Sequence, residues 1–250
     1  MLSGPPVTAT LAPAQLLDRF LAAAPRQRRS LLAGMQQRAT ELLPLIPDCL
    51  AGLDATGDDW AAGCLIQLLL ARGSEAEREA FKGRYPEGWL AVTSARGISF
   101  EPLQLQLQEQ GFEEADRLTS EILRQLAGPA AVQRGYVYYS EVQAMPETDL
   151  VSLDRLWLVY SQGRFGFSVQ GRLLQACGGR WEQLWLRLGW KKDGVWTRYP
   201  NAFTWSLEAP DGHMPLVNQL RGVRLMDALL QHPGLQQRIP SADSSGRGAR

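Results

Sequence analysis

Residues 149–170 read DLVSLDRLWLVYSQGRFGFSVQ, and the spacing of their apolar side chains predicts two packed helices joined by a tight turn. Four of these side chains stand at i, i+3, i+4 and i+7: Leu153, Leu156, Trp157 and Tyr160. A helix buries such a stripe on one face. The turn at 161–163 ends this helix, and Phe165 and Phe167 begin the next. The glycines nearby form neither a G-x-G-x-x-G nor a Walker loop, so the residues alone indicate an aromatic core cluster.

A long region rich in tryptophan and turn residues follows this segment. Residues 189–215 read GWKKDGVWTRYPNAFTWSLEAPDGHMP, where glycine and proline interrupt any helical period. Six of the eight tryptophans fall within residues 157–205. Trp181, Trp185 and Leu188 are at helical spacing, which favours a place in the core. Long loops in compact domains are usually functional or mobile, so we expect the aromatic loop to carry function.

Before residues 149–170, the stretch 103–128 reads LQLQLQEQGFEEADRLTSEILRQLAG and predicts a helix hairpin. The alternation of leucine suits a strand, but Leu, Gln and Glu are helix formers and favour a helix here. Gly111 makes the turn, and a second apolar stripe runs to Gly128. Such a hairpin could also be one unit of a tetratricopeptide-like array, but no second copy recurs at the period of about 34 residues.

The first part of the chain predicts short helices without visible chemistry. We expect helices over 13–24, 27–43 and 60–71, and a further one through Phe81. Asp58 and Asp59 precede the third helix, where carboxylates oppose the partial positive charge of a helix start. Residues 86–102 carry Gly and Pro without helical period and are the best candidate for a linker. The predicted domains are a helical bundle over 1–90, a second domain over 91–238 and a disordered tail over 239–250.

Charge and hydropathy exclude several classes of partner. Lys and Arg together number 26, as do Asp and Glu, so there is no overall field to attract nucleic acid, and we expect no nucleic-acid partner. The longest apolar run, residues 64–71, is far shorter than the roughly twenty residues of a membrane span. The N-terminal MLSGPPVTAT lacks the pattern of a secretory signal. These features predict a cytoplasmic protein without a transmembrane segment.

Catalytic and metal-binding patterns are missing from the sequence. The three cysteines form no C-x-x-C pair, and none stands near a histidine at metal-ligand spacing. Only two histidines occur, in neither an H-E-x-x-H nor a triad-like context. We therefore expect a non-enzymatic protein without a metal site. A helical-repeat scaffold for protein–protein interaction, without a ligand, is the alternative that the N-terminal helices leave open.

An ordered set of motifs resembles a known family. The string L-x-x-L-W-x-x-Y-S-x-G-R-F-G-F-S-V-Q begins at Leu153, is preceded by E-A-D-x-x-T ending at Thr119, and is followed by G-W…W-x-x-Y…F…A-P-x-G-H-x-P. From about Gly111 to Pro233 the set resembles the genomes-uncoupled-four family of tetrapyrrole-binding proteins. The family usually has Ile in place of Leu153, a conservative difference.

The resemblance implies an all-helical fold, with the N-terminal bundle followed by a cupped-hand domain that binds protoporphyrin IX and magnesium protoporphyrin IX without a covalent cofactor. It also implies stimulation or regulation of magnesium chelatase in chlorophyll biosynthesis, with the large porphyrin-binding subunit of that enzyme as partner. The implied location extends from the cytoplasm to the periphery of photosynthetic membranes.

A porphyrin is a flat apolar disc with two propionates on one edge, so its site needs aromatic walls and cationic groups at the rim. The candidate wall residues of the loop are Val195, Trp196, Tyr199, Phe203 and Trp205. The opposing lip, in YVYYSEVQAMP at 136–146, offers Tyr138, Val142 and Met145. Arg221 and Arg224, at i and i+3 of a predicted helix, are the candidates for the propionates. Each ring either faces ligand or packs in the core, and each arginine either binds ligand or is solvated. His213 is expected to be a turn histidine bonded to backbone rather than a metal ligand.

Overall fold

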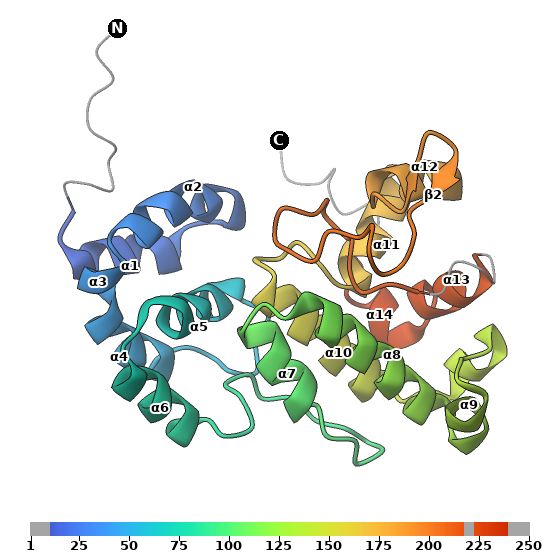
Figure 1. Cartoon of the computed structure of the whole chain (residues 1–250), viewed down its shortest axis with the longest axis horizontal. Helices are drawn as coiled ribbons and strands as arrows, with labels where there is room; N and C mark the ends of the chain where they lie inside the picture. The colour runs from blue at the N-terminus through green and yellow to red at the C-terminus, as the bar shows by residue number, and fades with distance from the viewer. Residues whose placement is uncertain (1–10, 218–222, 240–250) are drawn as a thin grey trace, which may run out of the picture.

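The computed structural model describes residues 11–217 and 223–239. Within these ranges the chain is built of helices and loops with a two-stranded hairpin, which confirms the all-helical prediction (Figure 1). None of the helices in these ranges combines the length and hydropathy needed to cross a bilayer. In chain order the elements are α1 (Pro13–Ala22), α2 (Pro25–Gln37), α3 (Ala39–Leu42), η2 (Leu43–Leu45), α4 (Ile46–Ala51), α5 (Trp60–Arg72), α6 (Glu75–Arg84), α7 (Glu101–Gln108), α8 (Phe112–Ala127), α9 (Pro129–Arg134), η3 (Tyr139–Ala144), α10 (Glu147–Tyr160), α11 (Phe167–Ala176), α12 (Trp181–Arg187), β1 (Lys191–Lys192), β2 (Val195–Trp196), α13 (Arg224–Leu230) and α14 (Pro233–Gln236).

The N-terminal half, α1 to α6, forms around the apolar helix α5. The carboxylate of Asp59 accepts a hydrogen bond from the backbone N–H of Ala61 at 2.9 Å and so caps this helix, as the two acidic residues before it predict. Ser74 and Glu77 form a capping box that begins α6. Most of α5 is buried, so this helix is the core of the half.

One prediction for this half is wrong, because the helix expected over 27–43 is two helices that meet at Arg38. The backbone of Arg38 leaves the helical region, with φ −105° and ψ 20°. Its guanidinium donates to the carbonyl oxygen of Leu11 at 2.6 Å. Met35 before the break and Leu42 after it are both buried. The apolar period continues through Arg38, so it gave no signal of the turn.

The two halves meet where α5 crosses α10, and one hydrophobic core runs through both. Gly63 of α5 lies so close to α10 that a Cβ on it would stand 2.2 Å from the carbonyl oxygen of Val159. Beside it, the amide of Gln67 donates to the carbonyl of Tyr160 at 2.6 Å. Arg155 of α10 donates to the carbonyl of Gly57 at 2.9 Å. The two halves are therefore in close contact, with the backbones of α5 and α10 packed against each other.

The candidate linker has no helix between α6 and α7, and much of it is held against other elements. Trp89 and Leu90 are buried. Asp149, at the start of α10, accepts hydrogen bonds from the Ser94 hydroxyl and, at 2.9 Å, from the backbone N–H of Ala95. This segment thus joins the two halves as a packed connection.

In the C-terminal half, α10 carries the predicted buried stripe, because all four of its members are fully buried: Leu153, Leu156, Trp157 and Tyr160. The indole of Trp157 donates to the Thr119 hydroxyl of α8 at 2.9 Å. Asp154 accepts from the backbone N–H of Ser168 at 2.8 Å and so caps α11. Gly166 has φ +125°, and a Cβ there would stand 2.8 Å from Asp154. Glycine is thus required in the motif R-F-G-F.

The predicted hairpin of helices is also confirmed, since α7 and α8 pack side by side on either side of Gly111 (Figure 1). After α12, the strands β1 and β2 pair in antiparallel register, Lys191 with Trp196. Residues 197–217 then form an irregular segment that returns toward α8. This return brings the aromatic loop over the middle of α8 and creates the site. Of the predicted tail, residues 240–250 lie outside the described residues, and Ile239 is buried.

Candidate ligand-binding site

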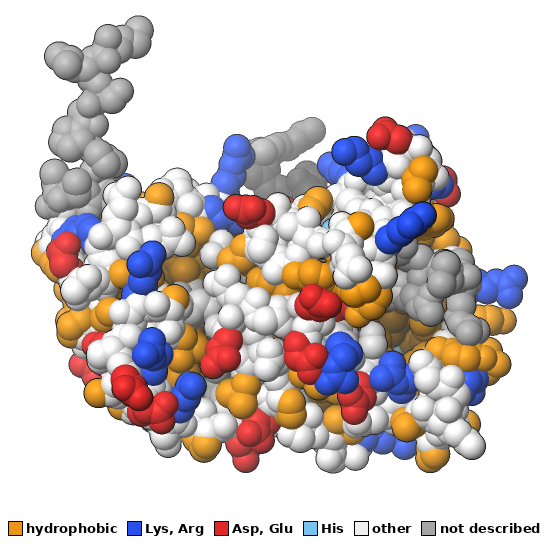
Figure 2. Space-filling view, viewed as in Figure 1, with side chains coloured by type: hydrophobic (Ala, Val, Ile, Leu, Met, Phe, Trp, Pro, Cys, Tyr) orange, Lys and Arg blue, Asp and Glu red, His pale blue; other side chains and the backbone are white. Residues whose placement is uncertain are grey.

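A cavity of about 890 Å³ lies between α8 and the aromatic loop. One wall is a polar stripe of α8, and the facing wall comes from β2, the loop after it and the segment just before residue 218. The lining residues are Asp116, Arg117, Ser120, Arg124, Trp196, Thr197, Arg198, Tyr199, Phe203, Leu216 and Val217. Figure 2 shows hydrophobic surface on this face of the molecule, above acidic and basic side chains along α8. The cavity therefore combines apolar area with charge.

The α8 wall follows from the amphipathic character of that helix. Its apolar side chains pack into the core, and along the edge of this buried face lie Asp116, Ser120 and Arg124 at i, i+4 and i+8. Arg117 is held by Glu114 at 2.6 Å and by Glu121 at 3.2 Å. Arg124 takes part in none of the ion pairs found among the described residues, and it is half-buried. Its guanidinium is thus available to an anion in the cavity.

Asp116 is a buried carboxyl group in the cavity lining. It is 2 % exposed, and its Oδ1 accepts a hydrogen bond from the backbone N–H of Leu216 at 2.6 Å. Burial raises the pKa of Asp116 to about 7, against the lowering effect of that hydrogen bond. The bond fixes the segment before residue 218 to α8. Asp116 thus both holds the cavity wall and places an ionisable group within it.

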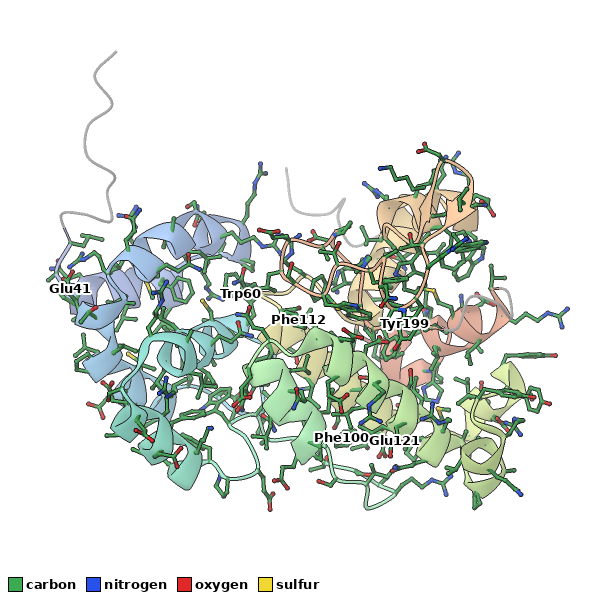
Figure 3. The ribbon with its side chains drawn as sticks, viewed as in Figure 1. Glu41, Trp60, Phe100, Phe112, Glu121 and Tyr199 are labelled. Atoms are coloured by element: carbon green, nitrogen blue, oxygen red, sulfur yellow. The ribbon has the colours of Figure 1, made fainter. Side chains whose placement is uncertain are left out.

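The aromatic wall is a cluster of packed rings. The ring centroids of Tyr199 and Phe203 lie 6.1 Å apart, and those of Phe203 and Trp205 lie 5.7 Å apart. The indole N–H of Trp205 donates to the carbonyl of Pro200 at 3.1 Å. Tyr199 remains exposed and lies beside α8 (Figure 3). Tyr199 and Phe203 therefore both line the cavity, Tyr199 as the exposed outer ring, and Trp205 packs beside Phe203.

His213 supports this wall from behind. Its Nδ1–H donates to the carbonyl of Leu188 at 2.5 Å, and its Nε2 accepts from the backbone N–H of Thr204 at 3.3 Å. Its ring packs on Phe203, with centroids 5.1 Å apart. The predicted bonding of this histidine to backbone is confirmed. Burial lowers the pKa of His213, because the charged ring would lose water, against the raising effect of the hydrogen bond to the carbonyl of Leu188.

Three of the residues predicted for the walls line this cavity, namely Trp196, Tyr199 and Phe203. Trp205 packs beside Phe203 without lining it, and Val195 points outward from the hairpin with 68 % of its surface exposed.

The other predicted residues are not among the described residues that line the cavity. Val142 and Met145 are buried in the core. Tyr138 is exposed, and the Arg134 guanidinium lies over its ring, 4.0 Å from the ring centroid. Arg224 begins α13 and lies over the Tyr139 ring at 5.5 Å. Arg221 falls outside the described residues.

The sequence did not point to the residues of α8. The available signal was the spacing of Asp116, Ser120 and Arg124, which begins in the motif E-A-D-x-x-T. Residues four apart share a helix face, but nothing in the sequence showed that this face meets the aromatic loop. Across residues 11–217 and 223–239, no group of three or more His, Cys, Asp or Glu side chains is placed to hold a metal ion.

Comparisons with known proteins place these features in context. A family model described as "GUN4-like" matches residues 93–233. The chain is 46 % identical over 173 residues to the "Ycf53-like protein" of Synechocystis sp. (strain ATCC 27184 / PCC 6803 / Kazusa), which covers 69 % of this chain and 74 % of the relative. It is 37 % identical over 156 residues to the "Tetrapyrrole-binding protein, chloroplastic" of Arabidopsis thaliana, with 59 % and 58 % covered.

Two solved structures are also similar. GUN4 from Chlamydomonas reinhardtii has a TM-score of 0.56 at 35 % identity, over 58 % of this chain and 93 % of that one. The ligand-free GUN4 of Arabidopsis thaliana has a TM-score of 0.52 at 38 % identity, over 56 % and 99 %.

Proposed function

Because this chain belongs to the GUN4-like family, we propose that it binds a tetrapyrrole in the cavity between α8 and the aromatic loop. The observation that carries the proposal is the pairing, in that cavity, of exposed aromatic surface with Arg124 and Arg198, which form no ion pair within the described residues. The match to the "Tetrapyrrole-binding protein, chloroplastic" of Arabidopsis thaliana supports it.

The shape and chemistry of the cavity fit a porphyrin. Tyr199, Phe203 and Trp196 supply rings on which a flat macrocycle can lie, and aromatic contacts of this kind favour flat apolar ligands. The cavity volume is within the range of small-molecule sites, roughly 300–1,000 Å³.

Two guanidinium groups can bind the propionates. Arg124 lies on the α8 wall and Arg198 on the loop wall. Within the described residues, neither takes part in an ion pair. A guanidinium binds a carboxylate in a two-point geometry, which adds direction to the charge attraction. Arg221 and Arg224 were predicted from the sequence to bind the propionates, and we keep them as further candidates for that role.

We propose protoporphyrin IX and magnesium protoporphyrin IX as the ligands, and a non-enzymatic role in regulating magnesium chelatase through its large porphyrin-binding subunit. Delivery of the macrocycle to that subunit would place the protein in chlorophyll biosynthesis, in the cytoplasm or at the periphery of photosynthetic membranes.

The test is a titration of the whole chain with protoporphyrin IX and with its dimethyl ester, under conditions that keep both soluble. Quenching of tryptophan fluorescence and a shifted Soret band report binding, and the diacid should bind more tightly than the diester. Absence of binding by either compound would refute the proposal and favour the scaffold alternative. Equal binding of both would remove the role of the arginines while leaving the aromatic walls.

A further inference from the structure

A second cavity, of about 280 Å³, lies at the junction of the two halves, and we propose that it binds a free α-amino acid. This cavity is separate from the one between α8 and the aromatic loop, since the two share no lining residue. Its described lining consists of Gln67, Leu70, Ala71, Arg78, Lys82, Gln108, Glu109 and Gln110.

The second cavity is built from both halves of the chain. Helix α5 packs against both α6 and α7, and the three helices lie together in Figure 1. The family model begins at residue 93, so α5 and α6 lie outside its match and α7 lies within it. A ligand in this cavity would contact both parts at once. The proposal therefore gives the N-terminal half a role in binding.

Two buried glutamines place hydrogen-bond acceptors in the cavity lining. Gln67 is 6 % exposed, and its Nε2 donates to the carbonyl oxygens of Leu107 at 3.1 Å and Tyr160 at 2.6 Å. Gln108 is 3 % exposed, and its Nε2 donates to the Tyr160 hydroxyl at 3.1 Å. Within the described residues neither Oε1 accepts a hydrogen bond, and neither is sealed from solvent. Buried acceptors of this kind take a donor from water or from a ligand.

The backbone adds to the negative potential of this wall. Leu70 and Ala71 belong to the last turn of α5, and Gln108 ends α7, so the C-terminal ends of two helices meet at the cavity. Helix C-termini carry carbonyl groups without an intrahelical partner and a partial negative charge. The wall formed by α5 and α7 therefore favours a small cation with several N–H donors, which is the chemistry of an ammonium group.

The wall formed by α6 has the opposite character. Arg78 is half-buried, and it takes part in none of the ion pairs found among the described residues. Lys82 stands one turn further along α6, and its Nζ lies 3.7 Å from Oε1 of Glu109. A guanidinium without a carboxylate partner can bind one from a ligand in a two-point geometry.

An α-amino acid carries the two groups that these walls require. Its ammonium fits the acceptors of α5 and α7, and its carboxylate fits Arg78 of α6. Leu70 and Ala71 offer aliphatic surface for a small apolar side chain. The volume is just below the range of drug-sized sites, roughly 300–1,000 Å³, and so suits a small metabolite. An amine or an acid alone would leave one wall without its partner.

The experiment measures the melting temperature of the whole chain with each of the common L-amino acids in millimolar excess. The amino acid that raises it most is then titrated by calorimetry, beside its analogue without the carboxylate and its analogue without the amine. Each analogue should bind roughly tenfold or more weakly, because one charged hydrogen-bonding group is lost. The inference is overturned if no amino acid binds. It is also overturned if the analogue without the amine binds as tightly as the amino acid, because the site would then be a simple anion site.

A pair of arginine variants tests the assignment of the carboxylate. Arg78→Gln should bind the amino acid roughly tenfold or more weakly and should bind the analogue without the carboxylate like the parent. Arg84→Gln is the matched control, because Arg84 is an exposed residue of the same helix outside the described lining. The control should bind the amino acid like the parent. Unchanged binding by Arg78→Gln, or an equal loss in both variants, would contradict the assignment.

Discussion

Replacement of Tyr199 by alanine should weaken porphyrin binding and leave the fold intact. Tyr199 is the outer ring of the aromatic wall and is 53 % exposed, whereas Phe203 behind it is 7 % exposed. The contacts of Tyr199 with Phe203 and Trp205 are between ring centroids about 6 Å apart, at the edge of the cluster. Loss of this ring therefore removes ligand-facing surface rather than core.

The magnitude follows from the exposed area. An aromatic side chain of this size has on the order of 200 Å² of surface, so about 100 Å² of Tyr199 is open, and a macrocycle lying on one face covers about half of it. At about 25 cal/mol per Å², the covered area is worth about 1 kcal/mol, which corresponds to a roughly five- to tenfold loss of affinity.

The assay is a fluorescence and absorption titration of Tyr199→Ala with protoporphyrin IX, beside a thermal melt. Tyr139→Ala is the matched control, because Tyr139 is 49 % exposed and lies outside the cavity lining. The control should bind like the parent. If Tyr199→Ala bound like the parent and Tyr139→Ala did not, the macrocycle would lie against η3 and the assignment of the aromatic wall would be wrong. A large fall in the melting temperature of Tyr199→Ala would show instead that this ring belongs to the core.

Three other changes test separate parts of the account. Arg124→Ala should weaken binding of the diacid more than binding of the diester, and it should make binding of the diacid less sensitive to salt. The melting temperature should change little. Equal effects on both ligands would place the propionates elsewhere. Gly63→Ala should lower the free energy of unfolding by roughly 1–3 kcal/mol or more in a urea titration, because the added methyl meets the backbone of α10; Gly83→Ala, which meets nothing within 4 Å in α6, should instead raise it by up to about 1 kcal/mol. The folded-state pKa of His213 is lowered, so its contribution to stability is present above the unfolded value of about 6.5 and is lost as the pH falls through the folded pKa. The free energy of unfolding, measured from pH 7.5 to 5, should therefore fall more steeply in the parent than in His213→Gln. Asp116, whose raised pKa favours the folded state at lower pH, contributes equally to both proteins, so the comparison cancels its effect. Identical dependence of the free energy of unfolding on pH in the two proteins would contradict the argument.

The helices were predictable where a local signal set them. The stripe of α10 was readable because burial on one face imposes a period of 3.6 residues, and all four predicted side chains are buried. The start of α5 was readable because a capping carboxylate stands next to the apolar run. The break at Arg38 was not, since the apolar period runs through it, and the contact of the Arg38 guanidinium with the carbonyl of Leu11 joins residues far apart in the sequence.

The site was only partly predictable for a related reason. Exposed aromatics in a long loop indicated one wall, and Tyr199 is among the residues that line the cavity, while its role in ligand binding stays a prediction. The other wall is a face of α8 whose role depends on the return of residues 197–217 across it. One of the contacts that hold this return is the bond between Asp116 and Leu216, which are 100 residues apart. A pattern confined to one segment carries no information about such a contact.

The most direct test of the central claim is a crystal structure of the whole chain with protoporphyrin IX bound. The account predicts a macrocycle between α8 and the aromatic loop, in contact with Tyr199 and with a propionate at Arg124. A macrocycle bound away from α8, for instance against Tyr138 with both propionates remote from Arg124 and Arg198, would contradict it.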